Sequence, residues 1–255
     1  MPLTVEPIRA FTDNYIWLFY QPGRNSACVV DPGDAVPVEA ALQEKGLSLE
    51  AILVTHHHAD HIGGIERLLH SRKVPVYGPG SIAQVSHPLG DGDRLQVDNT
   101  QFEIIAVPGH TLDHIAYAAP NEPLIFCGDT LFAGGCGRLF EGTPEQMWQS
   151  LQRIRQLPAA TRVYCAHEYT QANLRFAREV EPDNEELVNR ALQVAAQRNA
   201  DQATVPSLLD DELATNPFLR ADQEGVRLAA EKHARQTLGN ATEVFRVIRQ
   251  WKDSF

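Results

Sequence analysis

The seven residues 55–61, with the sequence THHHADH, are the feature that most restricts what this chain can fold into. The run contains four histidines and one aspartate, a combination that neither a packed core nor a solvated surface needs. It follows the apolar stretch 51–54 and precedes residues 62–65, which predicts a loop that leaves a buried strand and enters a helix. Imidazole and carboxylate groups are ligands of borderline metals such as zinc. So many ligands in one turn predict a metal site and favour two metals over one.

Length and charge limit the class of protein. The 255 residues are enough for a substantial core, and the net charge of -11 argues against nucleic acid as a partner, because nucleic-acid binders usually carry a basic face. Residues 1–6 do not resemble a signal peptide, and no stretch approaches the ~20 apolar residues that span a bilayer. We therefore expect a cytoplasmic protein without a membrane partner.

The cysteines form no C-x-x-C pair and are expected to be buried thiols: Cys28, Cys127, Cys136 and Cys165.

The pattern of elements changes along the chain. Up to about residue 163, strand-like and helix-like segments are mixed, which predicts an α/β (α+β) fold with sheets packed face to face and covered by helices. Strands are predicted at 14–20, 26–31, 51–54, 74–77, 94–97, 102–107, 115–118 and 124–127, and helices at 36–44 and 65–70. Beyond residue 169 the periodicity is helical over 174–180, 185–198, 223–235 and 242–251, with no convincing strand. We predict a catalytic domain over residues 1–169 and a helical domain over residues 170–255.

Three further clusters of polar residues stand where a predicted strand ends: 108–114, 128–130 and 166–169. A rigid scaffold aims such loops, and functional groups are often placed there. A single histidine at a strand end is usually a surface residue or a hydrogen-bonded core residue. Together with the first run, however, His110, Asp129 and His167 become candidate metal ligands.

The order H-x-H-x-D-H, then His in a Gly-His-Thr context, then Asp, then His resembles the metallo-β-lactamase superfamily. The resemblance implies an αββα sandwich that holds two divalent metals at one edge of its stacked sheets. The implied ligands are His56, His58 and His110 for one metal and Asp60, His61 and His167 for the other, with Asp129 bridging both.

Four polar residues near these clusters are not assigned as ligands. His57 is expected to face away from the metals, and His114 to orient a ligand through a hydrogen bond. Asp31 and Asp34 are expected to close a turn rather than bind metal.

Within the superfamily the chain is most similar to the glyoxalase II (hydroxyacylglutathione hydrolase) family. The similar stretches are FCGDTLF (126–132), GGCGRLFEGT (134–143), CAHEYT (165–170), NPFLR (216–220) and RQWKD (249–253). The resemblance implies hydrolysis of S-(2-hydroxyacyl)glutathione, typically S-D-lactoylglutathione, to the 2-hydroxy acid and glutathione, in methylglyoxal detoxification. It implies a metal-bound hydroxide as nucleophile at two divalent ions, zinc or else iron or manganese. We expect the enzyme to be a monomer.

Substrate binding needs cations, because glutathione carries two carboxylates. Arg249 and Lys252 are three residues apart on a predicted helix and share a face, although basic pairs on a terminal helix are usually solvated. With the resemblance, substrate binding becomes the favoured interpretation, and Arg138, Phe140 and Tyr169 resemble the remaining contacts.

The chain departs from the family pattern at three positions. Asp113 stands where glycine is common, Phe140 where some relatives have tyrosine, and Arg138 where some have lysine. Phe140 removes one hydroxyl contact to the substrate, while Arg138 keeps the charge and changes the donor geometry. None of the three changes removes an implied metal ligand.

Three other functions compete with thioester hydrolysis. A mononuclear-iron glutathione persulfide dioxygenase exists in the superfamily, but the complete second ligand set, with His61 and His167, argues against it. The acidic net charge disfavours a nuclease. A purely structural metal site is disfavoured because structural zinc sites are commonly rich in cysteine.

Overall fold

The structure is a computed structural model that describes residues 3–255, and the chain forms two compact units. The first unit consists of Met1–Ala106 and Asp113–Gly128, and the second of Val107–Leu112 and Asp129–Phe255. Met1 and Pro2, which belong to the stretch considered above for a signal peptide, lie outside the described residues. The domain division expected after residue 169 stays a prediction.

The first unit contains a sheet in the order β1-β2-β3-β4-β5-β6. Its strands are β1 (Thr4–Ala10), β2 (Asn14–Tyr20), β3 (Ser26–Val30), β4 (Ser48–Leu53), β5 (Val76–Gly78) and β6 (His87–Pro88). The first three strands pair antiparallel, whereas β3, β4, β5 and β6 pair in parallel. Because β3 and β4 are parallel, with Val30 opposite Leu53, the residues that follow both strands emerge at one edge of the sheet.

Four further strands of the first unit run in the order β10-β9-β8-β7. They are β7 (Arg94–Val97), β8 (Thr100–Ala106), β9 (Ile115–Ala119) and β10 (Leu124–Gly128). The two sets of strands pack face to face, since the Phe19 ring of β2 lies 5.6 Å from both the Phe102 ring and the Phe126 ring. This is the predicted arrangement of stacked sheets.

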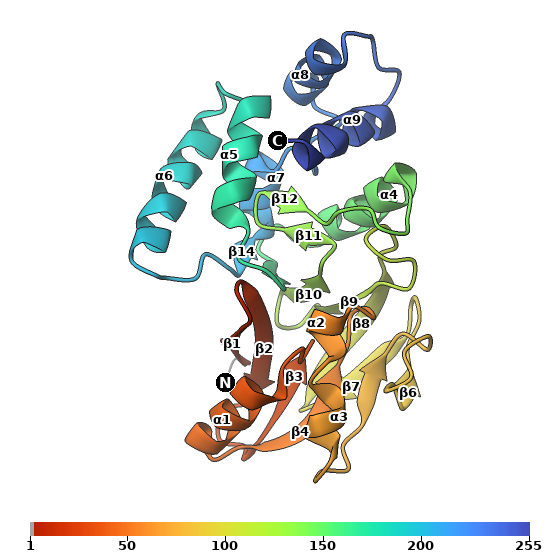
Figure 1. Ribbon diagram of the computed structural model, residues 1–255, viewed down its shortest axis with the longest axis vertical. Coiled ribbons are helices and arrows are strands. Elements are labelled where there is room, and N and C mark those ends of the chain that lie inside the picture. The colour runs from red at the N-terminus through yellow and green to blue at the C-terminus, as the bar shows by residue number, and fades with distance from the viewer. Residues whose placement is uncertain (1–2) are drawn as a thin grey trace. The chain divides into compact units, whose positions relative to one another are not determined.

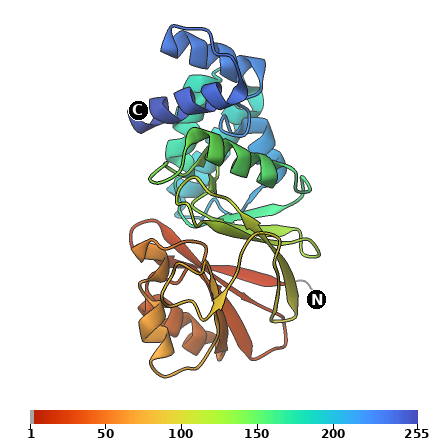
Figure 2. The ribbon, with the colours of Figure 1, turned by 90° about the vertical axis from the view of Figure 1, so that its right-hand side faces the viewer.

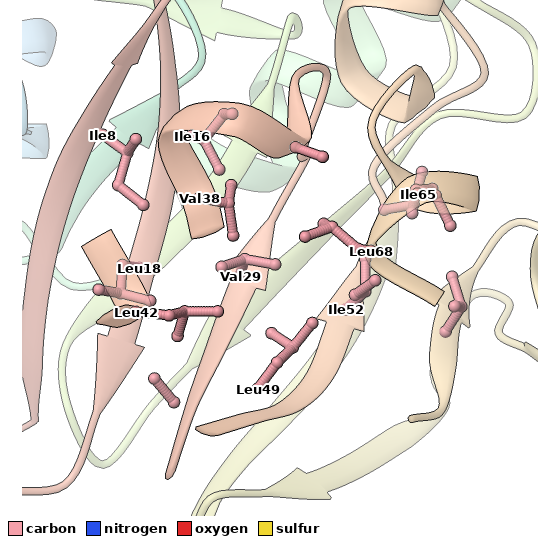
Figure 3. Close-up of a cluster of buried hydrophobic side chains, with 14 of the residues drawn as sticks. Ile8, Ile16, Leu18, Val29, Val38, Leu42, Leu49, Ile52, Ile65 and Leu68 are labelled. Atoms are coloured by element: carbon pink, nitrogen blue, oxygen red, sulfur yellow. The ribbon is translucent and has the colours of Figure 1, made fainter. Parts of the chain in front are cut away.

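Helices cover the outer face of the first sheet. They are α1 (Ala35–Lys45) and α3 (Ile65–Leu69), with the single turn α2 (Ala59–Ile62) between β4 and α3. Asp34 caps α1 by accepting a hydrogen bond from the backbone N–H of Val36, and Gly46 ends the helix in the left-handed conformation at φ 64°. Figure 3 shows Val38 and Leu42 of α1 and Leu68 of α3 directed toward Val29 and Ile52 of the sheet. Burial of these side chains holds the layers together.

The second unit is mainly helical. Its elements are β11 (Leu131–Phe132), β12 (Gly135–Cys136), α4 (Pro144–Arg155), β13 (Arg162–Cys165), α5 (Thr170–Val180), α6 (Glu185–Asn199), β14 (Ser207–Leu208), α7 (Leu209–Thr215), α8 (Glu224–Ala234) and α9 (Ala241–Asp253). The region from α5 onward is almost entirely coiled ribbon (Figures 1 and 2). Asn240 caps α9 by accepting from the N–H of Glu243, and a Thr143–Gln146 capping box begins α4.

Most predicted elements are present, and the α/β fold with a helical carboxy-terminal region is confirmed. The expectation of no strand beyond residue 169 is wrong, because Ser207 pairs with Val163 in the two-residue strand β14. Two residues are too short to show an alternating pattern. Sequence reasoning also missed β1, α4 and α7.

Candidate active site

The histidine run follows β4 in the first unit and becomes the start of α2, as predicted. His58 is the residue before the first helical turn, and Asp60 and His61 lie within that turn. His56 Nε2 lies 3.1 Å from His58 Nδ1, and His61 Nε2 lies 3.5 Å from Asp60 Oδ2. The fold therefore brings the four predicted ligands of this unit close together.

Asp31 contacts a predicted ligand directly, which sequence reasoning missed. It closes a turn after β3, as expected, and its backbone is left-handed at φ 53°. Its buried carboxylate accepts hydrogen bonds from Thr55 N and Thr55 Oγ1, both at 2.7 Å, and lies 3.0 Å from His61 Nδ1. A carboxylate on Nδ1 fixes the imidazole so that Nε2 points away from Asp31. The parallel pairing of β3 and β4 was the signal that could have placed Asp31 beside the run.

His57 and His114 both lie next to the four grouped residues and make different contacts. The His57 Nδ1 atom lies 3.1 Å from Asp113 Oδ1, and Asp113 also accepts a hydrogen bond from Ser81 Oγ. His114 stacks on His56, with ring centroids 4.5 Å apart and planes 15° from parallel. The carboxylate that replaces the common glycine at position 113 thus pairs with His57.

The second unit brings three predicted ligands together. His110 Nε2 and His167 Nε2 each lie 3.4 Å from the same oxygen, Asp129 Oδ2. All three side chains are buried. Residues separated by almost sixty positions in sequence therefore converge on one carboxylate oxygen.

Main-chain contacts fix the orientation of this second group. His110 Nδ1 donates to the carbonyl of Arg138 at 2.9 Å, which leaves Nε2 directed at Asp129. Gly137 is required beside it, because a Cβ atom there would lie 2.0 Å from the carbonyl oxygen of Asp129. The His167 ring stacks on Tyr169 at 4.8 Å with an interplanar angle of 4°.

A buried polar network supports the loop that carries Arg138. Glu212 Oε2 accepts from Gly134 N at 2.8 Å and from Asn216 Nδ2 at 2.9 Å, and Arg190 pairs with the same carboxylate. Asn216 also donates to the carbonyl of Gly135 at 2.9 Å. Buried polar groups of this kind are stable when they are satisfied. The Asn216 contacts give a physical role to the NPFLR stretch.

The predicted substrate residues all belong to the second unit. Arg249 is buried, donates to the carbonyl of Cys136 at 2.9 Å and stacks over Phe218 at 5.0 Å. Lys252 lies over the Phe176 ring at 5.4 Å. Burial, followed by repulsion from Arg249, lowers the pKa of Lys252 to about 8. Arg249 and Lys252 are therefore not a solvated pair, unlike most basic pairs on a terminal helix.

Phe140 and Tyr169 stand beside predicted metal ligands. The Phe140 ring is exposed and meets the His110 ring edge-on at 5.2 Å. Tyr169 contacts Phe132 edge-on at 5.3 Å in addition to stacking on His167. Each aromatic ring thus contacts the imidazole of a predicted ligand.

The cysteines are buried free thiols, as expected. Burial raises the pKa of Cys165 to about 12, so its thiol stays protonated and donates to the carbonyl of His167 at 3.6 Å. Burial also raises the pKa of Cys136, although Arg249 partly opposes the shift.

Two family models match consecutive parts of the sequence. Residues 11–167 match the metallo-beta-lactamase superfamily, and residues 168–255 match the hydroxyacylglutathione hydrolase C-terminus. A protein named hydroxyacylglutathione hydrolase from Alkalilimnicola ehrlichii is 56% identical over 250 residues, which cover 96% of this chain and 97% of the relative. The chain belongs to the hydroxyacylglutathione hydrolase family. Relatives of the same name from Idiomarina loihiensis and Pseudomonas aeruginosa PAO1 are 50% and 51% identical and cover 99% of this chain and 100% of their own lengths.

Two solved structures share the fold of this member of the hydroxyacylglutathione hydrolase family at lower sequence identity than these relatives. A B3 metallo-beta-lactamase, BLEG-1, aligns with a TM-score of 0.65 at 22% identity over 85% of this chain and 99% of its own. ETHE1 from Myxococcus xanthus aligns with a TM-score of 0.67 at 23% identity over 98% and 91%. These similarities show the metallo-β-lactamase fold.

Proposed function

We propose that this protein hydrolyses the thioester of S-(2-hydroxyacyl)glutathione, typically S-D-lactoylglutathione, to the 2-hydroxy acid and glutathione. The observation that carries the proposal is the near-complete match to hydroxyacylglutathione hydrolases, which includes the helical end that bears Arg249 and Lys252. The same relatives do not favour the persulfide dioxygenase alternative.

The donor groups fit divalent metals. Each unit gathers imidazole nitrogens and carboxylate oxygens, and cysteine is absent from the predicted ligand set, which suits catalytic rather than structural sites. We propose that His56, His58 and His110 hold one metal, that Asp60, His61 and His167 hold the other, and that Asp129 bridges both. When bound, the two ions supply a water of lowered pKa and polarise the thioester carbonyl. Zinc is our proposed metal, with iron or manganese as alternatives.

Residues around the proposed centre orient its ligands and the substrate. Asp31 and the Arg138 carbonyl each contact the Nδ1 atom of one proposed ligand, His61 and His110, which would leave Nε2 to bind a metal. Arg249 and Lys252 would bind a glutathione carboxylate, and Arg138, Phe140 and Tyr169 the rest of the substrate. Within the second unit Arg138, Arg249 and Lys252 form a positive cluster in an acidic protein, which would attract an anionic substrate.

The leaving group explains why little acid catalysis is needed. A thiol has a pKa of about 8.5, so a thiolate departs far more readily than an alkoxide or an amide nitrogen. The assigned residues would bind and orient the substrate, and a thioester would need little further help from a general acid.

The proposal is tested by metal analysis combined with an assay of thiol release from S-D-lactoylglutathione. We expect about two metal equivalents per chain and efficient hydrolysis. Replacing both Arg249 and Lys252 with Ala should raise KM much more than it lowers kcat, because these side chains bind ground state and transition state alike. Arg246→Ala, at an exposed position of the same helix, is the matched control and should leave KM unchanged. Failure of the metal-loaded protein to cleave the thioester, with good cleavage of another substrate, would refute the proposal.

No helix among the described residues is long and apolar enough to cross a membrane. We propose a cytoplasmic monomer with a small-molecule substrate and no nucleic-acid partner. We also propose residues 1–169 as the catalytic domain and residues 170–255 as the substrate-binding domain.

A further inference from the structure

Asp253 places one carboxylate oxygen between two arginines of the proposed substrate-binding cluster. Its Oδ1 atom accepts a hydrogen bond from Arg249 Nη2 at 2.9 Å and lies 3.8 Å from Arg138 Nε. Arg249 and Asp253 are four residues apart on α9, whereas Arg138 comes from the glycine-rich loop after β12. A carboxylate of the protein thus contacts two of the cations that we assign to substrate binding.

The two arginines differ in their freedom to leave Asp253. The Arg249 side chain is 4% exposed and is also held by the Cys136 carbonyl and the Phe218 ring. The Arg138 side chain is 66% exposed, and its ion pair with Asp253 is the longer of the two. Asp253, at 42% exposure, is itself reachable from solvent. Arg249 therefore keeps Asp253, while Arg138 can exchange it for another anion.

The cluster around Asp253 has an excess of positive charge. Arg138, Arg175 and Arg249 all act electrostatically on Lys252, and burial and these three cations lower its pKa. Asp253 is the carboxylate that contacts two of these cations. Removing its charge would therefore increase the positive potential that an incoming carboxylate meets.

We propose that Asp253 is a positioning residue that acts as an internal competitor, occupying Arg138 until the carboxylate of a glutathione thioester displaces it. The inference rests on the proposed function, since it requires an anionic substrate at Arg138. Asp253 affects the affinity for the substrate and takes no part in breaking the thioester bond, so its replacement changes KM and not kcat.

The test compares wild type, Asp253→Asn, Arg138→Gln and the double variant as metal-loaded enzymes at low ionic strength. Asn keeps an acceptor oxygen for Arg249 and removes the charge that competes for Arg138. We expect Asp253→Asn to lower KM for S-D-lactoylglutathione by about two- to five-fold, the size of a partly exposed ion pair, with kcat unchanged. The same change should tighten glutathione binding measured by calorimetry. In the Arg138→Gln background the Asp253→Asn change should have little effect, and added salt should reduce it.

Two controls make the outcome decisive. Asp222→Asn removes a carboxylate of similar exposure from an ion pair with Arg155 and should leave KM unchanged. Asp253→Ser removes the same charge with a smaller side chain and repeats the test independently, with folding checked by thermal unfolding. A rise in KM in both Asp253 variants, or an equal decrease with and without Arg138, would overturn the proposal. Failure of the wild type to cleave the thioester would instead refute the proposed function.

Discussion

The two units hold their candidate metal ligands in opposite ways. The first unit takes four of them from the six residues His56 to His61, directly after one strand, whereas the second takes His110, Asp129 and His167 from three distant loops. The compact run depends on a side-chain carboxylate, Asp31, for its orientation, while the dispersed group depends on main-chain contacts and a stacked tyrosine. A site can therefore be dense in sequence or assembled by the fold, and each kind should fail under different substitutions.

The largest effect should separate two histidines of the compact run. His61→Ala removes a proposed ligand and should lower kcat/KM by about 10³-fold, with about one metal equivalent lost. His57→Ala, four residues away and paired with Asp113, should stay within a few-fold of wild type and keep both metals. Metal analysis and steady-state kinetics measure both. Equal losses of kcat/KM and of metal in the two variants would contradict the assignment of His61, and not His57, as a ligand.

The next largest effect concerns the packing beneath the run. Ile52 of β4 is fully buried among the side chains of Figure 3, so Ile52→Ala should lower the free energy of unfolding by about 2–5 kcal/mol. Leu187→Ala in the second unit should lower the free energy of unfolding by about 2 kcal/mol. Its cluster between α5 and α6 is smaller, so the neighbouring side chains can fill the cavity more easily. Urea unfolding measures both changes. A larger cost at Leu187 would reverse the proposed order of the two cores.

A smaller effect should show how the compact run is oriented. Asp31→Asn keeps the shape of the side chain but weakens its interaction with His61 Nδ1, and should reduce metal affinity by about 10–100-fold. Asp34→Asn is the matched control from the same turn, because asparagine caps a helix as well as aspartate does. Competition with a chelator measures the affinity. Unchanged affinity in Asp31→Asn would leave the orientation of His61 to the backbone.

The smallest effect concerns Lys252, which lies in the second unit with the dispersed ligands. The pKa of Lys252 is lowered from its ordinary value to about 8, so the side chain is charged below about pH 8 and loses its charge above. KM for the thioester should therefore rise a few-fold as pH increases through 8, whereas an exposed lysine would stay charged to about pH 10. Lys252→Arg should abolish the rise, since arginine stays protonated. A pH-independent KM in the wild type would contradict the assignment.

The sequence was sufficient for the parts of the molecule that leave local patterns. The apolar stretch before the histidine run predicted the buried strand β4, and the resemblance implied the distant ligands. The contact of Asp31 with His61 was not predicted, because it depends on the parallel pairing of two strands that a helix separates. The burial of Arg249 and its sharing of Asp253 with Arg138 likewise depend on where α9 packs, which helical periodicity does not show.

Residue 138 uses different atoms for two roles. Its carbonyl oxygen accepts the hydrogen bond from His110 Nδ1, whereas its guanidinium faces Asp253 and solvent. Any amino acid at this position can supply the carbonyl, so exchange between arginine and lysine leaves the His110 contact intact. A change of side chain at this position would thus alter the surface that we assign to the substrate, while the hydrogen bond to the candidate ligand His110 would remain.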